Sequence, residues 1–464
     1  MGPKRKVLVI GLDCAAPALV FDSWLNDLPN TKRLVQEGIW GRMFSTIPPI
    51  TCPAWMSMVT SKNPGRLGIF GFRNRSNYSY EDVWIANSTV IKEQTLWDII
   101  SREGHTVGMI GVPQTYPPRP VNGFMVTDFL APDTSADYTY PSYIKDEVRA
   151  AVGNYILDCE KFRTENKDAL LAEIHEMTKT RFDLVEAFLA KKPDFYMFVE
   201  MGVDRIYHGF WKFMDKTHRK YVAGNKYENA IKEYHQYIDK RIGELLKRLD
   251  DDTVVLVVSD HGAKKMDGAI NINDWLIREG YLKLKREPEP GKTVKLEKAG
   301  VDWENTKAWG LGGYYGRLFL NVKGREAKGV VDPKDYEKVR NELIAKLEAI
   351  TDEKGKNIGT RVIKPQEVYP GGHLDQAPDL IIYFGNLYWR STGNIGHDSI
   401  HSFETEVGPD DAVHDEYGIF IMWDPKAKRG RQLKDIKIYD VAPTILSTMG
   451  IKVPAEMEGK VLTA

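Results

Sequence analysis

The stretch Lys6-Val7-Leu8-Val9-Ile10-Gly11-Leu12-Asp13 decides the fold class of this chain. Its apolar residues follow one another without polar interruption, which is typical of a strand buried on both faces of a parallel sheet. The run ends on a carboxylate. Because the ligands of parallel α/β sheets collect beyond the carboxyl ends of the strands, Asp13 occupies a position where a functional site is expected.

Further along the chain, buried strands alternate with helical stretches. The other strands that we predict are 40–46, 106–111, 194–201, 253–260, 380–384 and 418–423. The helices that we predict are 30–37, 54–60, 167–190, 227–249 and 335–349. This alternation predicts an α/β fold with a mostly parallel central sheet and helices on both of its faces.

The length of 464 residues exceeds what one ordinary hydrophobic core organises, so two lobes or one large decorated α/β domain is expected. We predict one large α/β domain, 1–464, that carries two inserted segments. Segment 133–181 begins as a loop and turns helical, and segment 279–330 contains the glycine-rich run 310–316. Either segment could cover the site as a cap, and a surface insertion without a catalytic role is the equal alternative.

The composition argues against several function classes. Hydrophobic residues make up 42% and charged residues 28%, the balance of a soluble globular protein. The formal net charge of −1 provides no overall field for a nucleic acid polymer or an anionic membrane. No apolar run reaches the roughly 18–20 residues of a membrane span. Three cysteines are too few for a disulfide framework, so a cytoplasmic location is expected.

Two pairs of residues have the spacing of metal ligands. Asp260 and His261 directly follow the buried run 254–259, and two adjacent ligand types at the mouth of a strand are unusual. Asp204 and His208 lie four residues apart, which on a helix places both side chains on one face. One metal ion could then contact both, although a surface ion pair is the more common outcome of such spacing.

Two single residues complete the set. Thr51 lies in the predicted loop 48–53, just before a helix, where a threonine is commonly an N-cap. His414 precedes the predicted strand 418–423. The full set offers three carboxylates, three imidazoles and one hydroxyl, namely Asp13, Thr51, Asp204, His208, Asp260, His261 and His414. This mixture suits two Zn²⁺ or Mn²⁺ ions better than Mg²⁺, which prefers oxygen ligands.

The order and spacing of these fragments resemble the alkaline phosphatase superfamily, most closely its type I phosphodiesterase/nucleotide pyrophosphatase family. The motifs that carry the resemblance are the first strand with Asp13, Thr51-Cys52-Pro53-Ala54-Trp55, the run 63–69, Asp204-x-x-x-His208, Ser259-Asp260-His261-Gly262, His414 and the closing run 439–451. The resemblance implies an alkaline-phosphatase-like three-layer sandwich. Segments 133–181 and 279–367 match much less specifically.

The resemblance also implies roles for individual residues. It implies that Asp13, Thr51, Asp260 and His261 hold the metal ion that activates the nucleophile. It implies that Asp204, His208 and His414 hold a second ion. Thr51 would be the catalytic nucleophile and would form a covalent phospho-threonine intermediate. The expected substrate is a small phosphoester, with a nucleotide as one candidate.

Two alternatives stay open at this point. The superfamily also contains phosphomutases, which return the phosphoryl group to the substrate. Those enzymes carry a large inserted domain soon after the nucleophile or in the middle of the chain, and the stretch between Thr51 and Asp204 does not look like one. A non-catalytic protein could hold metal with the same residues, but structural zinc sites usually close with four ligands, often cysteines. Diester, monoester and phosphonate substrates all stay possible, and the oligomeric state is not predicted.

Overall fold

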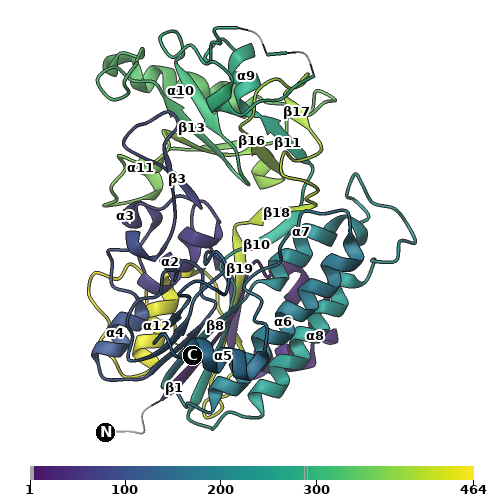
Figure 1. Cartoon of the computed structure of the whole chain (residues 1–464), viewed down its shortest axis with the longest axis vertical. Helices are drawn as coiled ribbons and strands as arrows, with labels where there is room; N and C mark the ends of the chain where they lie inside the picture. Colours follow the sequence, from purple (N-terminus) through teal and green to yellow (C-terminus); the bar gives the residue numbers. More distant parts are fainter. Residues whose placement is uncertain (1–4, 287, 290, 464) are drawn as a thin grey trace.

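The computed structural model describes residues 5–286, 288–289 and 291–463. The chain forms two lobes, each built around its own hydrophobic cluster (Figure 1). The larger lobe contains the N- and C-terminal parts of the chain. The smaller one, which we call the second lobe, comprises residues 268–402 and lies at the top of Figure 1.

A ten-stranded sheet forms the centre of the larger lobe. Its strands follow the order β20 (Arg431–Gln432), β2 (Ile39–Phe44), β19 (Tyr417–Trp423), β9 (Thr253–Val258), β1 (Lys6–Leu12), β8 (Phe195–Glu200), β5 (Val107–Ile110), β6 (Gly123–Val126) and β7 (Thr139–Tyr140), with β21 (Ile436–Lys437) also paired to β2. The five strands from β9 to β6 are parallel. Only β19 and β7 run against their neighbours, so the predicted mostly parallel sheet is confirmed.

Strand β1 lies between β8 and β9, and all its residues from Val7 onward are buried. This explains why its sequence is apolar without alternation. Gly11 is needed at its end, because a Cβ there would lie 2.5 Å from the Trp55 indole. That close approach lets the Trp55 Nε1–H reach Asp13 Oδ2 at 2.8 Å.

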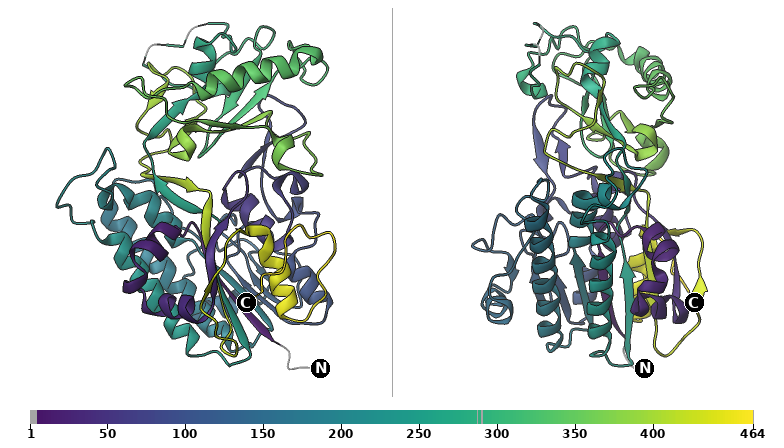
Figure 2. Two further views of the ribbon diagram at one scale, coloured as in Figure 1. Left: turned by 180° about the vertical axis from the view of Figure 1, so that it is seen from behind. Right: turned by 90° about the vertical axis from the view of Figure 1, so that its right-hand side faces the viewer.

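Helices lie on either side of this sheet, as predicted (Figures 1 and 2). They are α1 (Pro29–Glu37), α2 (Thr51–Thr60), α3 (Pro64–Leu67), α4 (Leu96–Arg102), α5 (Ile144–Val152), α6 (Lys167–Leu189), α7 (Gly202–Met214), α8 (Ala230–Leu246) and α12 (Val441–Thr448). Helices α6, α7 and α8 pack together on one side, and α2, α4 and α12 on the other. Helix α2 begins at Thr51, so the predicted loop 48–53 is wrong for residues 51–53, which are helical.

The second lobe contains two small sheets. One has the order β12 (Ala308–Leu311), β13 (Gly316–Leu320), β15 (Leu380–Tyr383) and β14 (Arg361–Ile363), and the other β16 (Trp389–Thr392), β11 (Gly268–Asn271) and β17 (His401–Ser402). Its helices are α9 (Ile272–Arg278), α10 (Tyr336–Glu348) and α11 (Pro365–Val368). The prediction that strand 380–384 belongs to the central sheet is therefore wrong. It is β15, whose antiparallel partners bury an equally apolar run.

Two short ribbons run between the lobes. Strands β10 (Gly262–Lys265) and β18 (Ala412–Asp415) pair with each other and lead into and out of the second lobe. The hairpin of β3 (Arg73–Arg75) and β4 (Val83–Ile85) reaches the second lobe, where Arg75 Nη2 lies 2.9 Å from Glu326 Oε1. Segment 133–181 includes β7 and α5 of the larger lobe, and segment 279–330 belongs to the second lobe. That either acts as a cap stays a prediction.

Among the described residues, no helix combines the length and the apolar character of a membrane span. Cys14, Cys52 and Cys159 are all buried free thiols. The predicted cytoplasmic location stays a prediction.

Candidate metal centre

The seven predicted site residues come together at one edge of the central sheet. Asp13 follows β1, Asp260 and His261 follow β9, and Asp204 lies in the first turn of the helix after β8. Parallel strands with their carboxyl ends at one edge explain this convergence. Helix α2 contributes its first residue, Thr51, and strand β18 contributes His414. None of the seven side chains is more than 4% exposed, so the centre lies in the interior.

The first group of ligand types is Asp13, Asp260 and His261. One ligand atom from each lies within 4.8 Å of the other two. His261 Nε2 is 3.1 Å from Asp260 Oδ2 and 3.9 Å from Asp13 Oδ1. The Thr51 hydroxyl is 3.4 Å from the same nitrogen. The four residues that the family resemblance assigns to one metal ion are therefore neighbours.

The second group is Asp204, His208 and His414, again with one ligand atom each within 4.8 Å of the others. Asp204 Oδ1 lies 3.2 Å from His208 Nε2 and 3.7 Å from His414 Nε2. Asp204 and His208 share one face of helix α7, as their spacing predicts. The two groups adjoin, because the rings of His261 and His414 stack with centroids 3.8 Å apart.

Cys14 offers a third combination, since its sulfur lies within 4.8 Å of ligand nitrogens of His261 and His414. However, its thiol donates to the Gly262 carbonyl at 3.4 Å. Burial raises the pKa of this thiol well above its usual range. Because the thiolate is the form that binds metal, Cys14 is a poorer ligand than the carboxylates beside it.

Orphaned polar atoms show that the centre fits divalent cations. Asp13 Oδ1, Asp260 Oδ2 and His208 Nε2 are buried and make no hydrogen bond within the described chain. The other carboxylate oxygens are satisfied, since Asp13 accepts from Trp55 and Asp260 Oδ1 accepts from the Cys14 N–H at 3.1 Å. Leaving buried polar atoms unpaired costs about 1–3 kcal/mol each. Coordination of a cation would remove that cost.

Hydrogen bonds to the outer ring nitrogens orient the three imidazoles. His208 Nδ1 is 2.7 Å from Asp410 Oδ1, and His414 Nδ1 is 2.8 Å from the Pro49 carbonyl oxygen. His261 Nδ1 is 3.2 Å from the Gly262 carbonyl oxygen. With Nδ1 as the donor, the neutral form of each ring carries its lone pair on Nε2, on the side of the centre, which is the tautomer a metal ligand needs.

The electrostatics of the centre favour bound cations. Burial raises the pKa of Asp13 and of Asp260, and each is raised further by a neighbouring carboxylate, Asp204 and Asp13 respectively. Burial lowers the pKa of His261 to about 4 and that of His414 well below its usual range. Both imidazoles are thus neutral at pH 7, and a divalent ion would offset the repulsion that Asp13 and Asp260 experience from the neighbouring carboxylates.

Several side chains of the centre were not singled out from the sequence. They are Arg163, Arg205, Tyr314, Arg390 and Asp410. Arg205 donates to Asp204, while Arg163 Nε and Arg390 Nη1 lie 2.9 and 2.7 Å from Asp410 Oδ2. Although burial opposes ionisation of Asp410, His208 and Arg163 hold its pKa well below the usual range. For Asp410, the sequence offers one local signal, its position four residues before the predicted ligand His414.

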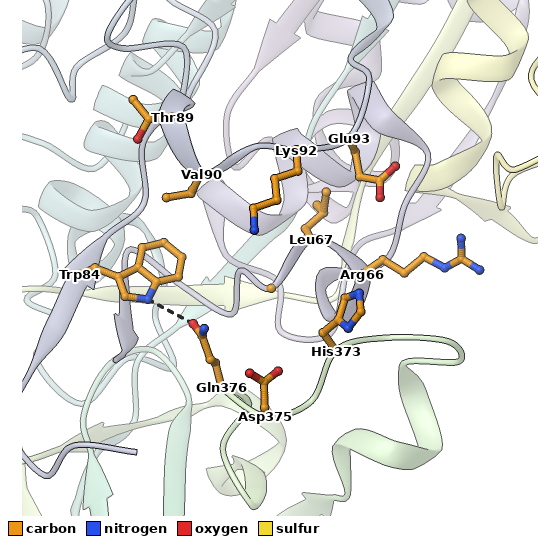
Figure 3. Close-up of a pocket in the computed structure, with 11 residues that line it drawn as sticks. Arg66, Leu67, Trp84, Thr89, Val90, Lys92, Glu93, His373, Asp375 and Gln376 are labelled. Atoms are coloured by element: carbon orange, nitrogen blue, oxygen red, sulfur yellow. Dashed lines mark hydrogen bonds between the residues drawn. The ribbon is translucent and has the colours of Figure 1, made fainter. Parts of the chain in front are cut away.

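A separate cavity of about 560 Å³ lies beside helix α3 (Figure 3). The residues that line it are Arg66, Leu67, Gly68, Trp84, Thr89, Val90, Lys92, Glu93, His373, Asp375 and Gln376. Trp84 Nε1 donates to Gln376 Oε1 at 3.3 Å across one side of it. None of the seven candidate site residues lines this cavity, so it is not the metal centre.

Comparison with known proteins identifies the family. Residues 7–411 match the family model of type I phosphodiesterase / nucleotide pyrophosphatase, and the chain belongs to this family. No sequence among curated proteins matches it. Among solved structures, human ectonucleotide pyrophosphatase / phosphodiesterase 5 matches with a TM-score of 0.57 and 13% sequence identity, over 98% of this chain and 97% of that one. The structural match confirms the predicted fold, and the family model confirms the resemblance seen in the motifs.

Proposed function

We propose that this protein is a two-metal phosphoester hydrolase of the phosphodiesterase/nucleotide pyrophosphatase type, with Thr51 as its nucleophile. One observation carries the proposal. Two adjoining groups of carboxylates and imidazoles lie within the family's matched fold, and the Thr51 hydroxyl lies 3.4 Å from a nitrogen of the first group. A closed structural metal site would have no use for a hydroxyl at that position.

The two ligand groups would hold one divalent ion each, the first together with the Thr51 oxygen. Their mixture of three imidazoles and three carboxylates favours Zn²⁺ or Mn²⁺. When bound, such ions lower the pKa of a coordinated hydroxyl or water and offset the negative charge of a phosphoryl group.

Thr51 would be the group that attacks phosphorus. Its oxygen would form a bond to phosphorus as the bond to the leaving-group oxygen breaks, and the hydroxyl proton would pass to the leaving group. This step yields a phospho-threonine, which still carries the second ester group of a diester substrate, and an alcohol or phosphate product. Water then hydrolyses the phospho-threonine and restores the Thr51 hydroxyl. The first backbone N–H groups of helix α2, at Thr51 and Cys52, have no partner within the helix and could bind a phosphoryl oxygen.

The family description supports a small phosphodiester or a nucleotide as the substrate. A phosphomutase is the second candidate, because the second lobe is a mid-chain body with its own core. A large body of this kind in the middle of the chain is expected of mutases.

Hydrolysis of two chromogenic esters separates these candidates. With zinc or manganese present, we expect the kcat/KM of bis(p-nitrophenyl) phosphate to exceed that of p-nitrophenyl phosphate by at least about tenfold, or about 1.4 kcal/mol in transition-state free energy. A clear monoester preference would contradict the diester specificity. Failure to cleave either ester, together with phosphoryl transfer within a sugar phosphate, would favour the mutase.

A further inference from the structure

Tyr314 brings the second lobe into contact with the candidate metal centre. It lies between β12 and β13, in the glycine-rich run 310–316. Its ring stacks on the imidazole of His414, with centroids 4.1 Å apart and an interplanar angle of 24°. It also stacks on His208, at 4.9 Å and 25°. One side chain of the second lobe therefore faces two of the three proposed ligands of the second metal ion.

The turn that presents Tyr314 is fixed to strand β16. Gly313 and Ser391 exchange two backbone hydrogen bonds of 2.8 and 2.9 Å. A Cβ on Gly312 would lie 2.7 Å from the Ser391 carbonyl oxygen, so only glycine allows this approach. Arg390, the neighbour of Ser391, places its guanidinium carbon 4.6 Å from the centroid of the Tyr314 ring. The position of the ring is thus set by the second lobe.

The Tyr314 hydroxyl also joins the contacts that orient His208. It lies 3.1 Å from Asp410 Oδ2 and 3.3 Å from His208 Nδ1. Asp410 Oδ1 is in turn 2.7 Å from the same imidazole nitrogen. Arg163 Nη2 donates to the hydroxyl at 2.5 Å. The hydroxyl, the carboxylate and the imidazole therefore form a closed set of contacts on the outer side of His208.

We propose that Tyr314 is a positioning residue through which the second lobe holds His208 and His414 in the orientation that the second metal ion requires. This role rests on the proposed function. Loss of an outer contact of a metal-binding histidine typically lowers metal affinity or activity 10–100-fold. Tyr314 supplies two such contacts, the ring stacking and the hydroxyl, and substitution can separate them.

Metal titration of three variants tests this role. Tyr314→Phe removes the hydroxyl and keeps the ring, and Tyr314→Leu removes both. Tyr315→Phe is the matched control, because its hydroxyl donates to the Phe70 carbonyl, away from the centre. Metal-stripped full-length protein is titrated with Zn²⁺ against a chromogenic chelator. The visible spectrum of the Co²⁺-loaded protein reports the coordination geometry.

We expect Tyr314→Phe to weaken one of the two zinc sites by about tenfold and Tyr314→Leu by about 100-fold, each with an altered cobalt spectrum. Tyr315→Phe should match wild type in both measurements. Tyr314 variants that bind both ions with wild-type affinity and spectrum would overturn the role of Tyr314. If Tyr314→Leu does not fold, Tyr314→Phe decides the question.

Measurements on the wild-type protein separate the positioning role of Tyr314 from the proposed function. A wild-type protein that binds two ions and cleaves the diester, beside Tyr314 variants that behave identically, would overturn the positioning role alone. A wild-type protein that binds no metal would refute the proposed function, and the role of Tyr314 with it.

Discussion

Replacing Thr51 with alanine is expected to lower kcat for a phosphodiester by at least about 10³-fold, because removal of a covalent nucleophile leaves only the contribution of binding and charge stabilisation. The Thr51 side chain is buried at the start of helix α2 and lies 3.4 Å from His261 Nε2. The three other proposed ligands of that ion are unchanged in the variant. Steady-state hydrolysis and the metal content of the purified protein are the measurements.

Ser57→Ala provides the matched control for this variant. Ser57 is a buried hydroxyl residue of the same helix, and its Oγ has no hydrogen-bond partner within the described chain. Its removal should leave turnover and metal content unchanged. Thr51→Ala with near-wild-type turnover would rule out the nucleophile assignment. Loss of both turnover and metal from Thr51→Ala would show that Thr51 is required for metal binding, so that the loss of turnover alone could not assign it as the nucleophile.

Asp260→Asn is expected to abolish most of the stabilisation that the zinc ion of the first ligand group confers. An ion that binds only the folded protein stabilises it by about 4 kcal/mol at 1,000 times its Kd. Asp260 Oδ2 is one of the orphaned atoms of the centre, and an amide is a much weaker ligand than a carboxylate. Without metal, the variant should be at least as stable as wild type, because it buries one charge fewer beside Asp13. Thermal unfolding with and without zinc measures both effects.

The control for this variant is Asp267→Asn. Asp267 follows β10 and pairs with Lys265 at 3.1 Å on a partly exposed part of the chain. We expect this substitution to leave the zinc-induced rise in Tm unchanged. The same rise in Asp260→Asn as in wild type would exclude Asp260 from the metal centre.

The central sheet was predictable from the sequence because strands buried on both faces have continuous apolar runs. Strands β1 and β9 are such runs, and each is followed within two residues by a carboxylate of the centre. The same signal failed for β15, which is equally apolar but lies in the second lobe. Apolarity reports burial. It does not report which sheet a strand joins, since pairing partners are distant in sequence.

The inner part of the candidate site was predictable, and the outer part was not. Asp260 and His261 are adjacent in the chain, and Asp204 and His208 have helical spacing, so local geometry brings each pair together. Asp410, Arg163 and Tyr314 come from three segments that meet only in the folded protein. No local sequence pattern could indicate these long-range contacts, because tertiary packing alone determines them.

Zinc titration of the metal-stripped wild-type protein, with hydrolysis of bis(p-nitrophenyl) phosphate followed at each step, tests the proposed two-metal hydrolase most directly. We predict no turnover without metal and a rise in turnover that ends when two ions are bound per chain. Full turnover in the metal-stripped protein would contradict the proposal, and so would two bound ions with no hydrolysis of any phosphoester.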